Sequence, residues 1–291
     1  MSDFGGVAEA CGLIIGRIEY NRWVRTPTAD KPRKKNGAYK HLGDCAFIIN
    51  HATMSQTVIW RPDKNDPLVK IDRQAVADRR RAASDMLRAD QERAAHKARQ
   101  IVDSAVLGPH PYLAAKGFPE MHGLVSGENL IVPMMFSGKL CGCQIIAPDG
   151  GKKFLKGQRS GGASFTIGSK GGDWWCEGYA TGLSVHKALT ALRMPGKVHV
   201  CFSAHNMAKI ARPGVVVADR DESGAGEAAA IKTGLPYYLP EIGDFNDEMK
   251  RIGLFRASQQ LRRFLDNKRS VKTGANPHDG LTIGTHNRAG G

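Results

Sequence analysis

The chain has 291 residues and a formal net charge of +14, from 42 lysines and arginines against 28 aspartates and glutamates. Its composition, 41% hydrophobic and 24% charged residues, is that of a globular protein, and its length suggests about two domains. No apolar run approaches the length of a membrane span, and the N-terminal residues lack the pattern of a secretory signal. We therefore expect no membrane contact and a cytoplasmic location.

The six cysteines are spaced irregularly, and no two of them form a C-x-x-C pair. This pattern predicts reduced, mostly buried thiols in a cytosolic protein and no zinc site. The excess of positive charge predicts a polyanionic partner. Nucleic acid is the leading candidate, because no lipid-inserting segment accompanies the charge.

Residues 1–62 are predicted to form a small basic α+β domain. Within them, residues 22–40 carry seven lysines and arginines and a single aspartate. A solvated hairpin loop and a nucleic-acid contact both explain this stretch, because lysine and arginine displace counterions from phosphates. Aromatic side chains of the kind that stack on bases flank it, namely Tyr20, Trp23 and Tyr39. The residues that we expect to contact DNA are Arg33, Lys34 and Lys35.

Residues 63–107 are predicted to form a helical connector. From residue 70 to residue 107 the sequence is rich in Ala, Arg, Asp and Gln and contains neither Gly nor Pro, which favours one long helix. Its apolar residues form a thin stripe, and charges of both signs are interspersed along it. Such a helix is typical of a solvated connector, and direct contact with nucleic acid is the alternative.

Residues 108–172 combine a short helix, strands on either side of a turn, and a glycine-rich loop. The segment from Gly150 to Lys170 contains five basic residues and no acidic one. Glycine lets the backbone approach a ligand closely, so this segment is a candidate phosphate-binding loop. Glycine-rich basic loops also serve as plain linkers, and the sequence leaves both interpretations open.

From residue 173 onward, short apolar strands alternate with helices, which predicts a parallel sheet with helices on both faces. In such sheets the functional side chains lie just beyond the carboxyl ends of the strands. The acidic residues at these positions are Glu177, Asp219, Asp221, Asp244 and Asp247. Carboxylates held close together repel one another, so the cluster requires a cation, and oxygen ligands with open positions suit Mg²⁺ or Mn²⁺. A Glu-Gly pair 42 residues before an Asp-x-Asp pair, each after a strand, is a stronger signal than Asp-x-Asp alone.

These motifs resemble a TOPRIM domain, and specifically the primases of phages and plasmids. The resemblance is carried by WWCEGYATGLSVHKAL, VVVADRDESGAGEAAA and DFND, and it continues upstream through HPYLAAKGF, LIVP, QIIAPDGGKKFLKG and GGASFTIG. It covers about residues 108–255. It implies an α/β fold in which a TOPRIM domain, a Rossmann-like parallel sheet with flanking helices, occupies residues 173–249. A mixed α+β subdomain of the primase core at 108–172 and the small N-terminal domain would precede it.

The resemblance implies a DNA primase that makes short RNA primers from ribonucleoside triphosphates on single-stranded DNA, in the cytoplasm of a bacterial host. The reaction would be metal-dependent nucleotidyl transfer, with a separate replicative helicase as a further partner. By resemblance, Glu177 acts as general acid/base or metal ligand, and Asp219 and Asp221 hold Mg²⁺. Asp244 and Asp247 complete the metal site. The basic residues that would handle nucleotide and template are Lys153, Lys156 and Arg159.

The sequence also departs from the family pattern. Many bacterial replicative primases carry an aspartate four residues after the glutamate, where this chain has Thr181, so the number of bound ions stays open. The N-terminal zinc ribbon of those primases is absent from the sequence. Two other functions remain as alternatives, namely a TOPRIM nuclease that cuts DNA with the same acids and a non-catalytic replication accessory that binds single-stranded DNA.

The last part of the sequence divides at about residue 267. Residues 250–267 are predicted to form a basic amphipathic helix that buries its leucines and a phenylalanine. Residues 268–291 are polar and glycine-rich, and we expect a disordered tail.

Overall fold

The computed structural model of the chain describes residues 3–54, 56–62 and 73–273. The chain divides into two compact units, Met1–Asp90 and Gln91–Gly291. The described residues form a mixed α/β fold of seven helices and three sheets. Among these residues, no helix combines the length and the apolar character that a membrane crossing requires.

The first unit is built on an antiparallel sheet of four strands in chain order. The strands are β1 (Val24–Thr26), β2 (Gly37–His41), β3 (Ala46–Asn50) and β4 (Val58–Trp60), and they follow a short helix, α1 (Phe4–Ala10). One face of the sheet packs with α1 in a core that includes Phe4, Leu13, Tyr39 and Ile48. Tyr39, one of the aromatic residues next to the basic stretch, is 1% exposed and is therefore closed to base stacking.

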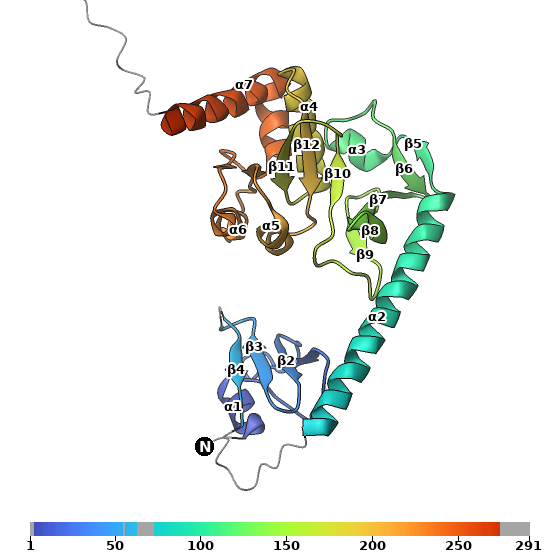
Figure 1. The fold of residues 1–291 in the computed structure, drawn as a ribbon, viewed down its shortest axis with the longest axis vertical. Helices are drawn as coiled ribbons and strands as arrows, with labels where there is room; N and C mark the ends of the chain where they lie inside the picture. The colour runs from blue at the N-terminus through green and yellow to red at the C-terminus, as the bar shows by residue number, and fades with distance from the viewer. Residues whose placement is uncertain (1–2, 55, 63–72, 274–291) are drawn as a thin grey trace, which may run out of the picture. The chain divides into compact units, whose positions relative to one another are not determined.

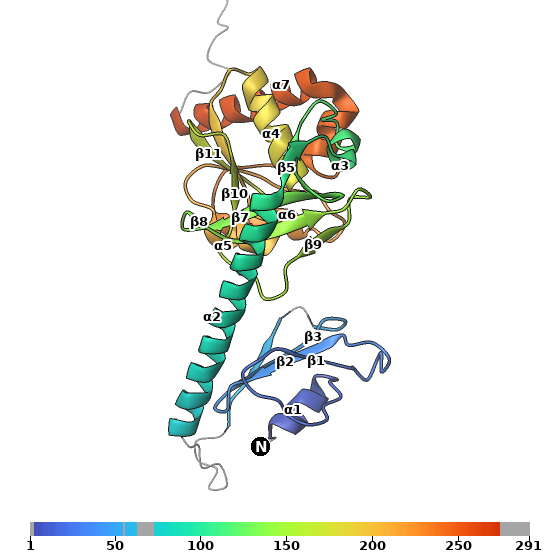
Figure 2. The same ribbon diagram turned by 90° about the vertical axis from the view of Figure 1, so that its right-hand side faces the viewer.

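The long helix expected before residue 107 is confirmed as α2 (Arg73–Ser104). The boundary between the two units falls inside it, after Asp90. In the first unit, Arg80 of α2 forms a 2.6 Å ion pair with Asp44. In the second unit, Ala98 of α2 is fully buried in a cluster on the antiparallel sheet of that unit. Figure 2 shows the last turns of α2 running alongside this sheet. Most other side chains of α2 are exposed, as the thin apolar stripe predicts.

An antiparallel sheet in chain order opens the second unit. Its strands are β5 (Val106–Gly108), β6 (Gly123–Ser126), β7 (Asn129–Phe136), β8 (Lys139–Ile146) and β9 (Lys152–Phe154). A short helix, α3 (Pro111–Ala115), lies between β5 and β6. The Nδ1 atom of His110 accepts a hydrogen bond from the Tyr112 backbone N–H, and proline stands at the first helical position, which favours a helix start here.

The predicted parallel sheet follows, and its order is β10-β12-β11-β13-β14. The strands are β10 (Phe165–Ile167), β11 (Gly172–Cys176), β12 (Gly196–Val200), β13 (Val215–Val217) and β14 (Tyr237–Tyr238). All neighbours are parallel except β10, which runs antiparallel to β12 and joins the sheet from the glycine-rich segment. The chain passes from β11 to β12 on one side and then to β13 on the other. The strand order therefore reverses between β11 and β13.

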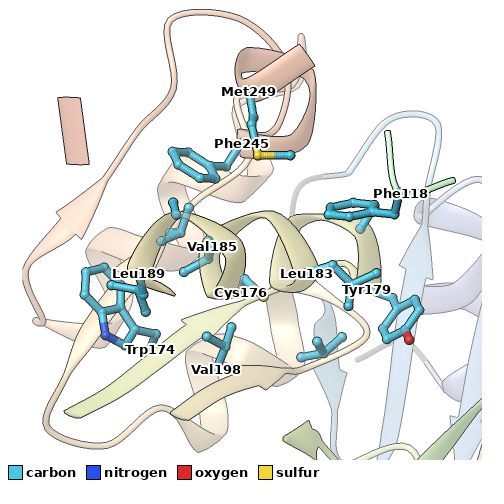
Figure 3. Close-up of a cluster of buried hydrophobic side chains, with 14 of the residues drawn as sticks. Phe118, Trp174, Cys176, Tyr179, Leu183, Val185, Leu189, Val198, Phe245 and Met249 are labelled. Carbon is cyan, nitrogen blue, oxygen red and sulfur yellow. The ribbon is translucent and has the colours of Figure 1, made fainter. Parts of the chain in front are cut away.

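Helices cover both faces of this sheet, which confirms the alternation read from the sequence (Figure 1). On one face lie α4 (Tyr179–Ala191) and α7 (Phe245–Thr273), and on the other α5 (Ala204–Ile210) and α6 (Ala225–Thr233). Successive side chains of a strand point to opposite faces, so Trp174 and Cys176 join the α4 and α7 core while Trp175 packs with α5 and α6. Figure 3 shows the first of these cores, in which Leu183 and Val185 of α4 lie between the sheet and α7.

Helix α7 contains the amphipathic helix predicted at 250–267 and extends beyond both of its ends. Its path breaks at Gly253, whose φ of 82° lies in the left-handed region that favours glycine. Leu261 is fully buried, whereas Leu254 is half-buried. The tail predicted at 268–291 lies outside the described residues from residue 274 onward.

Close backbone packing at the start of β13 provides a test of this sheet. An added Cβ at Gly214 would lie 2.3 Å from the backbone oxygen of Asp173, whereas an added Cβ at Gly172 has nothing within 4 Å. We expect Gly214→Ala to lower the free energy of unfolding by at least about 2 kcal/mol, because backbone cannot move aside as a side chain can. Gly172→Ala is the matched control at the start of β11. Urea denaturation measures both, and equal stabilities would contradict the pairing of β11 with β13.

Candidate active site

The acidic residues predicted from the sequence follow three adjacent strands of the parallel sheet. Glu177 directly follows β11, Asp219 lies two residues after β13, and Asp244 follows β14. Cys176 pairs with Val217, so β11 and β13 end at the same level of the sheet. Because the strand order reverses between these two strands, their carboxyl ends border the crevice where open α/β sheets bind ligands.

Asp219 is the centre of this group. Its Oδ1 atom is buried and finds no hydrogen-bond partner among the described residues. Burial, together with the nearby carboxylates of Asp244 and Glu177, raises the pKa of Asp219 to about 7. The side chain thus lies in a site that disfavours its own negative charge, which a proton or a cation would relieve.

Glu177 lies in the same electrostatic environment. Burial raises the pKa of its carboxyl, and the charge of Asp221 adds to that increase. The backbone N–H of Ala204 at the start of α5 and the ammonium group of Lys152 act in the opposite direction. Glu177 is therefore a partly buried carboxyl close to both negative and positive groups, as a proton-transfer residue requires.

Asp244 and Asp247 begin helix α7 with a reciprocal pair of hydrogen bonds. The Asp247 N–H donates to Asp244 Oδ1 at 2.9 Å, and the Asp244 N–H donates to Asp247 Oδ2 at 3.3 Å. This is a capping box, with aspartate in the place of the usual glutamate. The second oxygen of Asp244 accepts a 3.1 Å hydrogen bond from the hydroxyl of Thr181. Asp244 thus joins the acid group, and Asp247 is exposed at the helix start.

Asp221 performs a capping role at helix α6. One of its carboxylate oxygens accepts hydrogen bonds from Ser223 Oγ at 2.5 Å and the Ala225 N–H at 3.2 Å, and the other accepts from the Gly226 N–H at 3.1 Å. These hydrogen bonds lower the pKa of Asp221, which is exposed. An added Cβ at Gly226 would lie 2.2 Å from the backbone oxygen of Asp219, so only glycine lets α6 begin this close to β13.

The acid group fits a hard divalent cation. In the part of the chain that the structure describes, no three His, Cys, Asp or Glu side chains are close enough to hold a metal ion by themselves. Mg²⁺ does not require such a cage, because it keeps several waters and binds one or two carboxylates together with substrate phosphates. Asp219, with its unpartnered buried oxygen, and its neighbours Glu177 and Asp244 supply such carboxylates. The donor set is therefore compatible with Mg²⁺ or Mn²⁺.

Lys152 is a basic residue of this site that the sequence analysis did not select. Its ammonium lowers the pKa of both Asp219 and Glu177, which places it near the acids. It also lies 6.0 Å from the ring centroid of Tyr112 on α3. Tyr112 is 3% exposed, and burial with the nearby charge of Asp244 raises its pKa to about 12. Side chains alternate between the two faces of a strand, so Lys152 and Lys153 of β9 face opposite sides. This alternation is the pattern in the sequence that sets Lys152 apart from Lys153.

The three basic residues selected from the sequence lie on β9 and the loop that follows it. Lys153 and Lys156 are exposed. The guanidinium of Arg159 lies 3.4 Å from the ring centroid of Phe136, a cation–π contact that fixes its direction. Neither Lys153 nor Lys156 nor Arg159 is among the charges that shift the pKa of Glu177 or Asp219.

Side-chain amides order the glycine-rich loop between β9 and β10. Gln158 Oε1 accepts a hydrogen bond from the Cys143 N–H of β8 at 3.1 Å. Asn206 Oδ1 of α5 accepts a hydrogen bond from the Gly162 N–H at 2.8 Å. The loop is therefore held to β8 and to α5, whereas a plain linker would lack such contacts.

The residues expected to contact DNA in the first unit lie between β1 and β2. Arg33, Lys34 and Lys35 are all exposed there. They belong to a different unit from the acids.

No family model matches the chain. Among solved structures, it is similar to a chain in a structure of the bacteriophage T7 lagging-strand DNA polymerase interacting with primase domains of two gp4 subunits bound to an RNA/DNA hybrid and dTTP. The similarity has a TM-score of 0.36 and 14% sequence identity, and it covers 49% of this chain and 80% of that chain. The activity proposed below therefore rests on the residues of this chain.

The raised pKa of Asp219 predicts a pH dependence of stability. Between its ordinary pKa of 3.8 and about 7, Asp219 is protonated in the folded state and ionised in the unfolded chain, so its contribution to stability is lost as pH rises through this range. In EDTA, we expect the wild type to lose more stability than Asp219→Asn between about pH 5 and about pH 8. Mg²⁺ should restore stability at the higher pH. Urea denaturation measures this, and parallel pH curves for the two proteins would contradict the buried carboxyl.

Lys152 provides a second test of the same electrostatics. Removing its charge with Lys152→Met should raise the pKa of Asp219 further, because Lys152 favours the ionised carboxylate. Lys153→Met is the matched control on the adjacent residue. Carboxyl-carbon NMR of the metal-free protein measures the titration of Asp219 in each variant. An equal pKa in the two variants would place Lys152 away from the acids.

Proposed function

We propose that the chain is a TOPRIM-type primase that makes short RNA primers on single-stranded DNA by metal-dependent nucleotidyl transfer. The observation that supports this most directly is the buried, unpartnered Oδ1 of Asp219, beside Glu177 and Asp244 at the point where the strand order reverses. A carboxylate in this position is costly unless a cation joins it. The motifs around these acids resemble those of phage and plasmid primases, and this resemblance suggests that the cation assists nucleotidyl transfer.

In this proposal, Asp219 and Asp244 would hold Mg²⁺ or Mn²⁺. When bound, such an ion would neutralise charge that develops on the phosphates during transfer. Glu177 accepts the proton of the attacking 3′-hydroxyl while the hydroxyl oxygen bonds to the α-phosphorus of the incoming nucleotide. The bond from that phosphorus to the bridging oxygen breaks, and pyrophosphate leaves.

Positive side chains complete the proposed site. Lys152, close to both Glu177 and Asp219, would contact the triphosphate and offset the charge of the acids. Lys153, Lys156 and Arg159 would contact the template or the outer phosphates, as the resemblance implies. These side chains would contact phosphates rather than bases. Template binding should therefore be sensitive to salt and depend only weakly on the base sequence.

A primer-synthesis assay tests the proposal. With labelled ribonucleotides, Mg²⁺ and a single strand of mixed sequence, we expect the wild type to make short RNA. Asp219→Asn and Glu177→Gln should reduce synthesis to background while DNA binding stays unchanged, because both residues act on the reaction. Glu222→Gln is the matched control, since Glu222 is an exposed acid in the same loop as Asp221.

Two results would overturn the proposal. One is full synthesis by Asp219→Asn or Glu177→Gln. The other is DNA cleavage with Mn²⁺ in the absence of nucleotides, lost in the same two variants, which would assign these acids to a nuclease.

A further inference from the structure

The sheet of the first unit has an outer face opposite the α1 core, and a row of side chains crosses it. The pairing of β1, β2, β3 and β4 places Lys40 opposite Phe47 and Phe47 opposite Ile59. Continuing the pairing of Val24 with Tyr39 by one residue places Trp23 opposite Lys40. Alternation along the strands puts this row on the face away from Tyr39 and Ile48. We call the row Trp23, Lys40, Phe47 and Ile59 the outer row.

The outer row is apolar and accessible at several positions. Trp23 is 54% exposed and Ile59 is 56% exposed. The rings of Trp23 and Phe47 lie with their centroids 6.5 Å apart at an angle of 46°. Two aromatic rings on an open sheet, one of them more than half exposed, present surfaces on which planar groups can stack.

Positive charge surrounds the outer row. Lys40 lies on β2 at the register position between Trp23 and Phe47, and Arg25 follows two residues after Trp23 on the same face. The connection from β1 to β2 contains Lys31, Arg33, Lys34 and Lys35, all exposed. Across residues 22–40 there are seven basic residues and one acidic residue. The face therefore matches a ligand that combines planar apolar groups with repeated negative charge.

We propose that the outer row is a binding surface for single-stranded DNA. Bases stack on Trp23 and Phe47, while phosphates contact Lys40, Arg25 and the basic connection between β1 and β2. Unpaired bases expose their flat faces for such stacking, whereas the bases of a duplex are already stacked on one another. A protein partner fits the surface less well, because lysine is depleted in protein–protein interfaces and Lys40 occupies the centre of this row.

That the bound strand serves as the template rests on the proposed function, whereas the binding itself does not. The outer row belongs to the first unit and the acids belong to the second. Binding is therefore measurable without metal or nucleotide, and the two proposals can fail separately.

Fluorescence anisotropy of the full chain with a labelled oligothymidine in EDTA tests the surface. We expect Trp23→Ala to weaken binding about ten-fold, the typical effect of losing one stacking platform, and Trp23→Phe to retain most of the affinity. Lys40→Met should lower the slope of log affinity against log salt by about one, because one phosphate contact is lost.

Phe255→Ala is the matched control, since Phe255 is an aromatic residue of α7 with 76% exposure. Trp23 is mostly exposed, so circular dichroism of Trp23→Ala should match that of the wild type. Wild-type affinity in Trp23→Ala would overturn the proposal. So would equal competition by duplex DNA, or a concentration-dependent dimer that Trp23→Ala abolishes, since the row would then join two copies of the chain.

Discussion

The second unit depends on one electrostatic constraint, which is that the carboxyl of Asp219 is buried beside two other carboxyls. Its Oδ1 has no hydrogen-bond partner among the described residues, and its pKa rises to about 7. A folded chain tolerates such a group only if something else compensates for it. Lys152 compensates in part, and the remainder is left to a proton or a bound cation. The stability of the fold and the chemistry of the site are thus linked through the same atom.

Neighbouring acidic residues accept hydrogen bonds from the backbone N–H groups at the helix starts beside the site. These N–H groups are therefore not left to compete for the carboxylate of Asp219. The carboxylate of Asp221 satisfies the first N–H groups of α6, and the carboxylate of Asp247 accepts a hydrogen bond from the Asp244 N–H just before α7. Thr181 donates a hydrogen bond to Asp244. Its hydroxyl adds a donor and no charge, so the site concentrates fewer negative charges than it would with an aspartate at position 181.

Much of this architecture follows from local patterns in the sequence. The parallel sheet was predictable because its strands are short apolar runs that alternate with helices, and each acid follows one of these runs. Lys152 was missed, since choosing between it and Lys153 requires the pairing of β9 with β8, which brings Ile145 opposite Lys153. The contact of Thr181 with Asp244 joins residues 63 positions apart, and no local pattern encodes it. Trp23 and Tyr39 looked alike in the sequence, and only the strand register separates the exposed ring from the buried one.

The hydrogen bonds of Gln158 and Asn206 have a consequence for how anions bind. A flexible glycine-rich loop loses conformational entropy when it closes on a ligand, and that loss weakens binding. Here the loop is already held by β8 and α5, and the guanidinium of Arg159 is already directed by the ring of Phe136. The conformational entropy of this loop was therefore lost when the chain folded. An anion that binds at the loop contacts a preorganised surface.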